Sequence, residues 1–196
     1  MEIIIHRVNT IQKLKTIPNK YGCEIDIRSN GNDLILNHEP FEIGEFFDDF
    51  LNHYNHGLLV LNIKEAGIEN AVIEKVINKG IKRYFLLDVE FPYIFKATRA
   101  GVRDIAVRFS EDEPIEFITK YMKLVDWVWI DTITSLPIDN INSTILSKLK
   151  SCIVCPERWG RPEDILPYRQ KLNEINFNPT AVMTSLENVI NWEATT

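Results

Sequence analysis

Cysteine is scarce in this sequence, and a framework of disulfide bonds is therefore excluded. The chain has three cysteines among 196 residues, and the one close pair, Cys152 and Cys155, falls in an apolar run that predicts a strand. In a strand these two thiols point to opposite faces, which suits neither a redox turn nor a metal site. No second pair of cysteines is present to complete a zinc site. We therefore expect reduced, structural cysteines in a cytoplasmic protein.

Long apolar runs, basic clusters and nucleotide-binding motifs are also missing. No run reaches the roughly 20 apolar residues of a membrane span, and Met1–His6 lacks the basic start of a secretory signal. The net charge of -6, without a basic cluster, argues against nucleic acid as a partner. The length predicts a single domain over residues 1–196 and leaves the oligomeric state open.

Apolar runs alternate with amphipathic stretches along the whole chain, which predicts an α/β protein. Strands are expected at Ile3–His6, Cys23–Arg28, Leu58–Lys64, Tyr84–Glu90, Ile105–Phe109, Trp127–Thr132, Cys152–Glu157 and Ala181–Thr184, with a short hairpin strand at Leu34–Asn37. Helices are expected over 68–77, 91–100, 114–125, 144–149, 162–172 and 186–192. Such alternation fits a (β/α)8 TIM barrel or a doubly wound sheet. The absence of G-x-G-x-x-G and of a P-loop favours the TIM barrel.

The second predicted strand carries charge where a strand covered by helices should be apolar. Glu24, Asp26 and Arg28 alternate with apolar residues and therefore share one face. Two carboxylates held together repel each other unless a cation lies between them, and paired oxygen ligands suit Mg²⁺ or Ca²⁺. The ordinary alternative is an edge strand with one solvated face.

Further polar residues end the neighbouring strands. His6 and Arg7 close the first strand, and His38 follows the hairpin. Asn62 and Lys64 share a face of the next long strand. Two histidines near a carboxylate pair suggest a general acid and a general base. Arg7 and Lys64 would add the positive charge that phosphoryl chemistry requires.

The order of these residues resembles the signature of the glycerophosphodiester phosphodiesterase family. This family belongs to the phosphatidylinositol-phospholipase-C-like phosphodiesterases, which are TIM barrels. Its motifs H-R-G, E-x-D, H-D and E-x-K correspond to four segments of this chain, namely His6-Arg7, Glu24-Ile25-Asp26, His38-Glu39 and Asn62-Ile63-Lys64. The resemblance covers about the first third of the sequence.

The resemblance implies a metal-dependent hydrolase of small phosphoric diesters, with a place in lipid metabolism. It implies general acid and base roles for His6 and His38 and phosphate contacts for Arg7 and Lys64. It further implies a divalent cation, Mg²⁺ or Ca²⁺, bound by Glu24, Asp26 and the residue at position 62.

Two departures from the family pattern keep other functions open. Val8 replaces the glycine of H-R-G, and Asn62 replaces the third acidic ligand, which should weaken cation binding. The alternative is a catalytically impaired barrel of the same family that binds a phosphorylated metabolite or a protein partner. A sugar-phosphate isomerase or aldolase using Lys64 ranks last, because it leaves both histidines and the E-x-D pair without a role.

The chain is also short for a TIM barrel, which typically takes about 250 residues. The family has a sizeable insertion after its H-D motif, whereas here His38-Glu39-Pro40 runs almost directly into Phe41–Phe47, which is predicted to be helical. We therefore expect a compact (β/α)8 barrel without that insertion and with an open mouth over the metal site.

Overall fold

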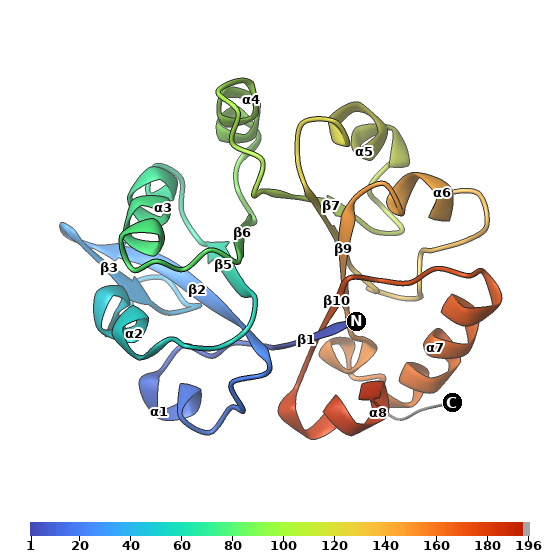
Figure 1. Cartoon of the computed structure of the whole chain (residues 1–196), viewed down its shortest axis with the longest axis horizontal. Coiled ribbons are helices and arrows are strands. Elements are labelled where there is room, and N and C mark those ends of the chain that lie inside the picture. Colours follow the sequence, from blue (N-terminus) through green and yellow to red (C-terminus); the bar gives the residue numbers. More distant parts are fainter. Residues whose placement is uncertain (194–196) are drawn as a thin grey trace. The chain divides into compact units, whose positions relative to one another are not determined.

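The computed structural model describes residues 1–193, and the chain divides into two compact units. The unit that we call the N-terminal unit contains Ile4–Ala100. The C-terminal unit combines Met1–Ile3 with the residues from Gly101 onward. Strands and helices alternate within each unit, as the sequence predicts (Figure 1). The single domain over residues 1–196 stays a prediction.

The N-terminal unit is built on parallel strands, and β2 lies between two of them. The strands are the second half of β1 (Glu2–Ile5), whose first two residues belong to the C-terminal unit, and β2 (Gly22–Asn30), β3 (Asp33–Leu36), β4 (Glu45–Phe46), β5 (Leu59–Ile63) and β6 (Tyr84–Leu87). β2 pairs in parallel with β1 and β5, and β5 pairs with β6. β3 and β4 add an antiparallel extension to the end of β2. The helices are α1 (Ile11–Leu14), α2 (Phe47–His53), α3 (Glu69–Asn78) and α4 (Phe91–Arg99).

The C-terminal unit repeats the parallel arrangement with four strands. They are β7 (Ala106–Phe109), β8 (Trp127–Ile130), β9 (Lys150–Val154) and β10 (Ala181–Thr184). The Glu2 N–H at the start of β1 donates to the Thr180 carbonyl beside β10 (2.8 Å). The helices are α5 (Ile115–Tyr121), α6 (Ser143–Leu146), α7 (Ile165–Glu174) and α8 (Val189–Glu193), and 3-10 turns span Pro156–Trp159, Pro162–Asp164 and Leu186–Asn188.

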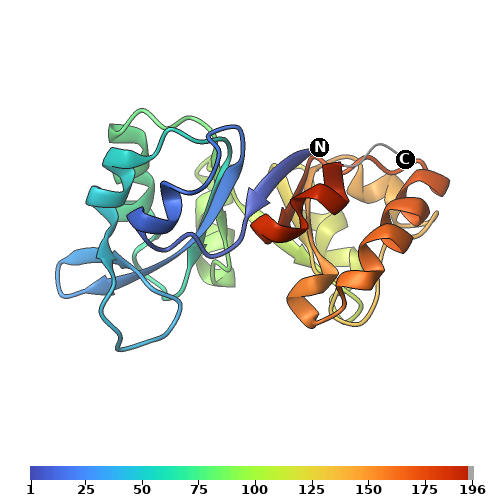
Figure 2. The same cartoon turned by 90° about the horizontal axis from the view of Figure 1, so that it is seen from below.

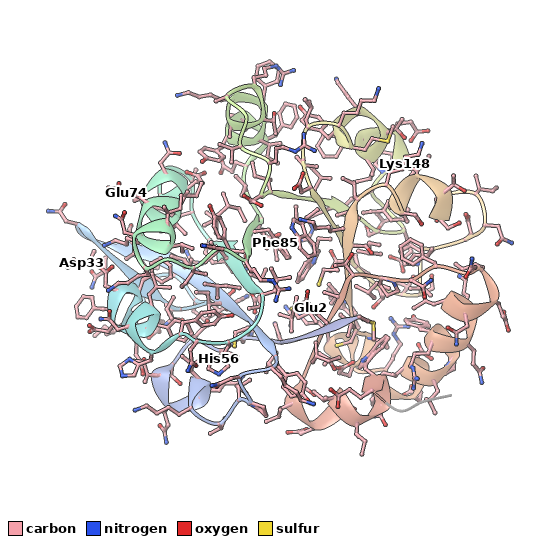
Figure 3. The ribbon with its side chains drawn as sticks, viewed as in Figure 1. Glu2, Asp33, His56, Glu74, Phe85 and Lys148 are labelled. Carbon is pink, nitrogen blue, oxygen red and sulfur yellow. The ribbon has the colours of Figure 1, made fainter. Side chains whose placement is uncertain are left out.

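Burial explains why these segments form strands. All five residues of β5 are buried, and Phe85 of β6 lies within the unit while Asp33 and Glu74 lie at its surface (Figure 3). The strands are thus covered on both faces, as expected for parallel sheets. All three cysteines are buried thiols. Within residues 1–193, no helix combines the length and the apolar character that a bilayer crossing needs.

The helix predicted over Phe41–Phe47 is wrong in its first six residues. The chain forms a loop up to Gly44 and then the short strand β4, and α2 begins only at Phe47. The apolar side chains of Phe41 and Ile43 are 105% and 89% exposed, so they form no buried helical face. Pairing of β4 with β3, which local sequence does not reveal, sets this conformation. Figure 2 shows this loop and the β2–β3 hairpin, both in blue, extending beyond α1 and α2.

Replacement of Gly44 by alanine should destabilise the protein. A Cβ at this position would lie 2.2 Å from the Leu36 carbonyl oxygen, so the β3–β4 pair would have to separate. We expect a loss of about 1–3 kcal/mol, typical of forced overpacking, in urea unfolding. The control is Glu42→Ala, in the same loop but exposed. A Gly44→Ala variant as stable as this control would contradict the close approach.

Candidate active site

The Glu24 carboxylate lies at the centre of a polar cluster in the N-terminal unit. Its Oε2 accepts a hydrogen bond from the Arg7 backbone N–H (2.8 Å), and its Oε1 accepts one from Asn62 Nδ2 (2.8 Å). His6 Nε2 lies 3.9 Å from Glu24 Oε2. Glu24 is 1% exposed, and β2 is paired on both sides. The edge-strand explanation of the charged face is therefore wrong.

The loop after β1 reaches Glu24 without the glycine of the family motif. Arg7, whose φ is 52°, has the left-handed backbone conformation, and Val8 does not. Val8 is fully buried, and its N–H donates to the Glu24 carbonyl (2.8 Å). Lys13 of α1 donates from Nζ to the carbonyls of His6 and Arg7 (2.9 Å each). A non-glycine residue in this conformation costs roughly 1–2 kcal/mol, so these contacts must hold it in place.

Asp26 is held by residues from two other segments. Asn9 donates from Nδ2 to Asp26 Oδ2 (2.8 Å) and accepts the Asp26 backbone N–H at Oδ1 (2.9 Å). Lys64 Nζ lies 3.2 Å from Asp26 Oδ1 and 3.6 Å from Asp88 Oδ2. Asp88 follows β6 and also has a left-handed backbone, with φ 57°. Asn9 is thus a further residue of the candidate site, and the sequence did not indicate it. Lys64 lies against two carboxylates.

His38 lies at the carboxyl end of β3 and is tied to the ends of β2 and β5. Its Nδ1 is 2.5 Å from Glu39 Oε1. Arg28 donates from Nη2 to the His38 carbonyl (2.9 Å) and from Nη1 to the Lys64 carbonyl (3.3 Å). The side chains of His6 and His38 are 23% and 33% exposed, so a small molecule can reach both rings.

The oxygen atoms of this cluster fit a hard divalent cation. Asp26 and Asn62 are register partners on β2 and β5. Both Asp26 Oδ1 and Asn62 Oδ1 are buried; the first faces the Lys64 ammonium, and the second accepts no hydrogen bond. Within residues 1–193, no group of three or more His, Cys, Asp and Glu is arranged to hold a metal ion. A cation held here would need the neutral amide oxygen of Asn62 beside the two carboxylates, an oxygen-only and weakly charged ligand set.

Burial and the neighbouring charge of Asp26 raise the pKa of Glu24 to about 7. Desolvation penalises the carboxylate form, and the Asp26 carboxylate adds like-charge repulsion. The hydrogen bonds from Asn62 and Arg7 and the charge of Lys64 act in the opposite direction. The raised pKa therefore makes Glu24 bind a proton more readily than an exposed carboxyl does when no cation is bound.

Replacement of Glu24 by glutamine should stabilise the cation-free protein at alkaline pH. Because the folded-state pKa lies above the unfolded value, the native state binds more protons between pH 4.5 and 7, and stability falls as the pH rises through this range. Glu24→Gln removes that loss, so its Tm at pH 8 should exceed that of the unmodified protein by at least ~3 °C. Scanning calorimetry at pH 5 and pH 8, both with chelator, measures the difference. An equal Tm difference at both pH values would contradict the raised pKa.

The strand ends of the C-terminal unit carry polar residues that contact one another. Arg108 pairs with Asp131, and Glu157 accepts hydrogen bonds from the Thr184 hydroxyl and the Ser185 N–H. Trp127 and Trp129 are buried in β8, as expected of core residues. Every residue predicted for the site, from His6 to Lys64, instead belongs to the N-terminal unit.

Comparison with solved structures identifies the fold. A protein from Agrobacterium tumefaciens assigned as a glycerophosphoryl diester phosphodiesterase matches with TM-score 0.70 and 10% identity, over 98% of this chain and 97% of that chain. A glycerophosphoryl diester phosphodiesterase from Parabacteroides distasonis matches with TM-score 0.65 and 9% identity, over 96% and 84%. A phosphodiesterase from Oleispira antarctica, solved with its product sn-glycerol-3-phosphate, matches with TM-score 0.67 and 15% identity, over 98% and 96%.

The class defined by these matches is an α/β protein with the TIM-barrel fold of the glycerophosphodiester phosphodiesterases. The doubly wound alternative is therefore wrong. No protein-family model and no curated protein matches the sequence. At 9–15% identity the likeness establishes the fold, and the chemistry of the site has to be argued from its own residues.

Proposed function

We propose that this protein is a cation-assisted phosphodiesterase that cleaves small phosphoric diesters. The observation that carries the proposal is the buried Glu24–Asp26 pair, with His6, Asn62 and Lys64 around it at the carboxyl ends of adjacent parallel strands. The active sites of TIM-barrel enzymes lie at this end of the strands. The fold shared with glycerophosphodiester phosphodiesterases supports the same reaction class.

Glu24, Asp26 and Asn62 would hold the cation through their side-chain oxygens. A bound divalent cation supplies positive charge that offsets the phosphodiester charge and increases the acidity of an attacking hydroxyl. The Arg7 guanidinium would contact the non-bridging phosphate oxygens. Lys64 balances the carboxylates, because its ammonium group lies against Asp26 and Asp88.

His6 and His38 would carry the proton transfers. One neutral imidazole accepts the proton of the attacking hydroxyl, and the other, protonated, donates to the oxygen of the departing alcohol. Their partial exposure leaves both rings accessible to substrate. Which histidine acts first depends on the orientation of the bound diester.

A binding protein without catalysis is the second candidate, and Asn62 favours it. Asn62 stands where the family has an acidic metal ligand, and its side chain is neutral. Its amide already donates a hydrogen bond to Glu24, another of the proposed cation ligands. Such a site would bind the cation weakly and could retain a phosphorylated metabolite without cleaving it.

One experiment separates the two candidates. The protein is assayed with bis(p-nitrophenyl) phosphate in Mg²⁺, Mn²⁺ or Ca²⁺, and its Tm is measured with each cation and with chelator. Hydrolysis that is abolished by chelator, together with a cation-dependent rise in Tm, supports the phosphodiesterase. A cation- or phosphate-dependent rise in Tm without hydrolysis supports the binding protein, and the absence of both rejects the cation site.

A further inference from the structure

Lys13 binds the main chain beside one candidate catalytic histidine. It lies on α1, the single helical turn whose N-cap is Thr10, and its ammonium donates to two successive carbonyls, those of His6 and Arg7. The carbonyl oxygens of His6 and Arg7 therefore both point to Lys13 Nζ, and the φ of Arg7 is 52°. The Ile11 N–H at the start of α1 donates to Glu45 on β4 (2.6 Å), which anchors the helical turn to the sheet.

Arg28 binds the main chain at the other candidate histidine. Its Nε and Nη2 both donate to the His38 carbonyl (3.3 and 2.9 Å), and its Nη1 donates to the Lys64 carbonyl (3.3 Å). Glu65 lies 4.0 Å from the same guanidinium. The planar guanidinium thus connects the end of β3 with the end of β5, and its rigid fork fixes the direction of the His38 carbonyl.

We propose that Lys13 and Arg28 are positioning residues, one for each histidine of the acid–base pair. Each acts on a backbone carbonyl, so neither has to touch the substrate. The proposal rests on the proposed function for its catalytic consequence, whereas the orientation of the two imidazoles can be measured without any activity. A misplacement of about 1 Å can cost a reaction as much as 100-fold in rate, so such supports matter to catalysis.

Imidazole NMR tests the positioning directly. The Cε1–Hε1 signals of the four histidines are recorded at one fixed pH on the full-length protein and are assigned with single His→Gln variants. Lys13→Met should shift the His6 signal alone, and Arg28→Met the His38 signal alone. His53 and His56 serve as internal references. Lys15→Met, at an exposed position two residues after Lys13, is the matched control.

Kinetics and stability complete the test. With bis(p-nitrophenyl) phosphate, we expect kcat to fall about 10- to 100-fold in each methionine variant, with KM changed less than about threefold. Lys13→Arg should restore both kcat and the His6 signal, since it can still donate to two carbonyls. The Tm of each variant should stay within about 3 °C of the unmodified protein.

Three results would overturn the proposal. One is an unchanged His6 signal in Lys13→Met or an unchanged His38 signal in Arg28→Met. Another is a shift of all four histidine signals with a fall in Tm, which would indicate a general structural role. The third is a methionine variant whose kcat equals that of Lys15→Met. If the two signals shift as expected but the unmodified protein hydrolyses no diester, the positioning stands and the proposed function fails.

Discussion

His6→Ala and His38→Ala should each lower kcat for bis(p-nitrophenyl) phosphate by about 10²- to 10⁴-fold, the range that proton transfer by a positioned side chain contributes. Neither ring is part of the packed core, since both are partly exposed. The expected loss therefore comes from missing proton transfer and not from unfolding. Steady-state kinetics with Mg²⁺, Mn²⁺ or Ca²⁺ and circular dichroism of each variant check both parts of this expectation.

His53→Ala is the control for these two variants, because His53 ends α2 and its ring contacts the Asp49 carbonyl (2.9 Å) within the same helix. It should retain full activity. Retention of more than about one tenth of kcat by a folded His6→Ala or His38→Ala variant would remove that histidine from the acid–base pair.

Asn62→Glu should tighten binding of Ca²⁺ or Mg²⁺ by about 10- to 100-fold, since the number of charged ligands is a main determinant of affinity at oxygen sites. In chelator the same variant should have a lower Tm than the unmodified protein. A third carboxylate would then be buried beside Glu24 and Asp26 with no cation to balance it. Isothermal titration calorimetry and thermal unfolding measure the two effects.

Asn62→Gln provides the matched control, because it lengthens the side chain equally without adding charge. Its cation affinity should not rise. If Asn62→Glu binds Ca²⁺ and Mg²⁺ no more tightly than Asn62→Gln does, position 62 is not part of a cation site.

The strand order and the cluster of charged residues could be predicted because they depend on local patterns. Period-two alternation placed Glu24 and Asp26 on one face of a strand, and both lie there. The alternation of strands and helices predicts an α/β protein for the same reason, whereas the choice of the TIM barrel rested on missing nucleotide-binding motifs and on the family resemblance. The burial of Glu24 and Asp26 could not be predicted, because alternating charge is equally typical of an edge strand.

The elements that the sequence did not predict depend on contacts between distant segments. Helix α1 is a single turn, too short for a periodic pattern, and its position depends on Glu45. Asn9 gains its role only through Asp26, 17 residues later in the chain. Phe41 and Ile43 look like part of a helical stripe, but β3–β4 pairing leaves them in solvent.

The left-handed backbone at Arg7 constrains how this loop can evolve. In the motif H-R-G the glycine is free to adopt such a conformation, whereas here a lysine from the next helical turn secures a residue that resists it. Loss of Lys13 alone would leave the strain unopposed, and selection would then favour small or amide residues at position 7.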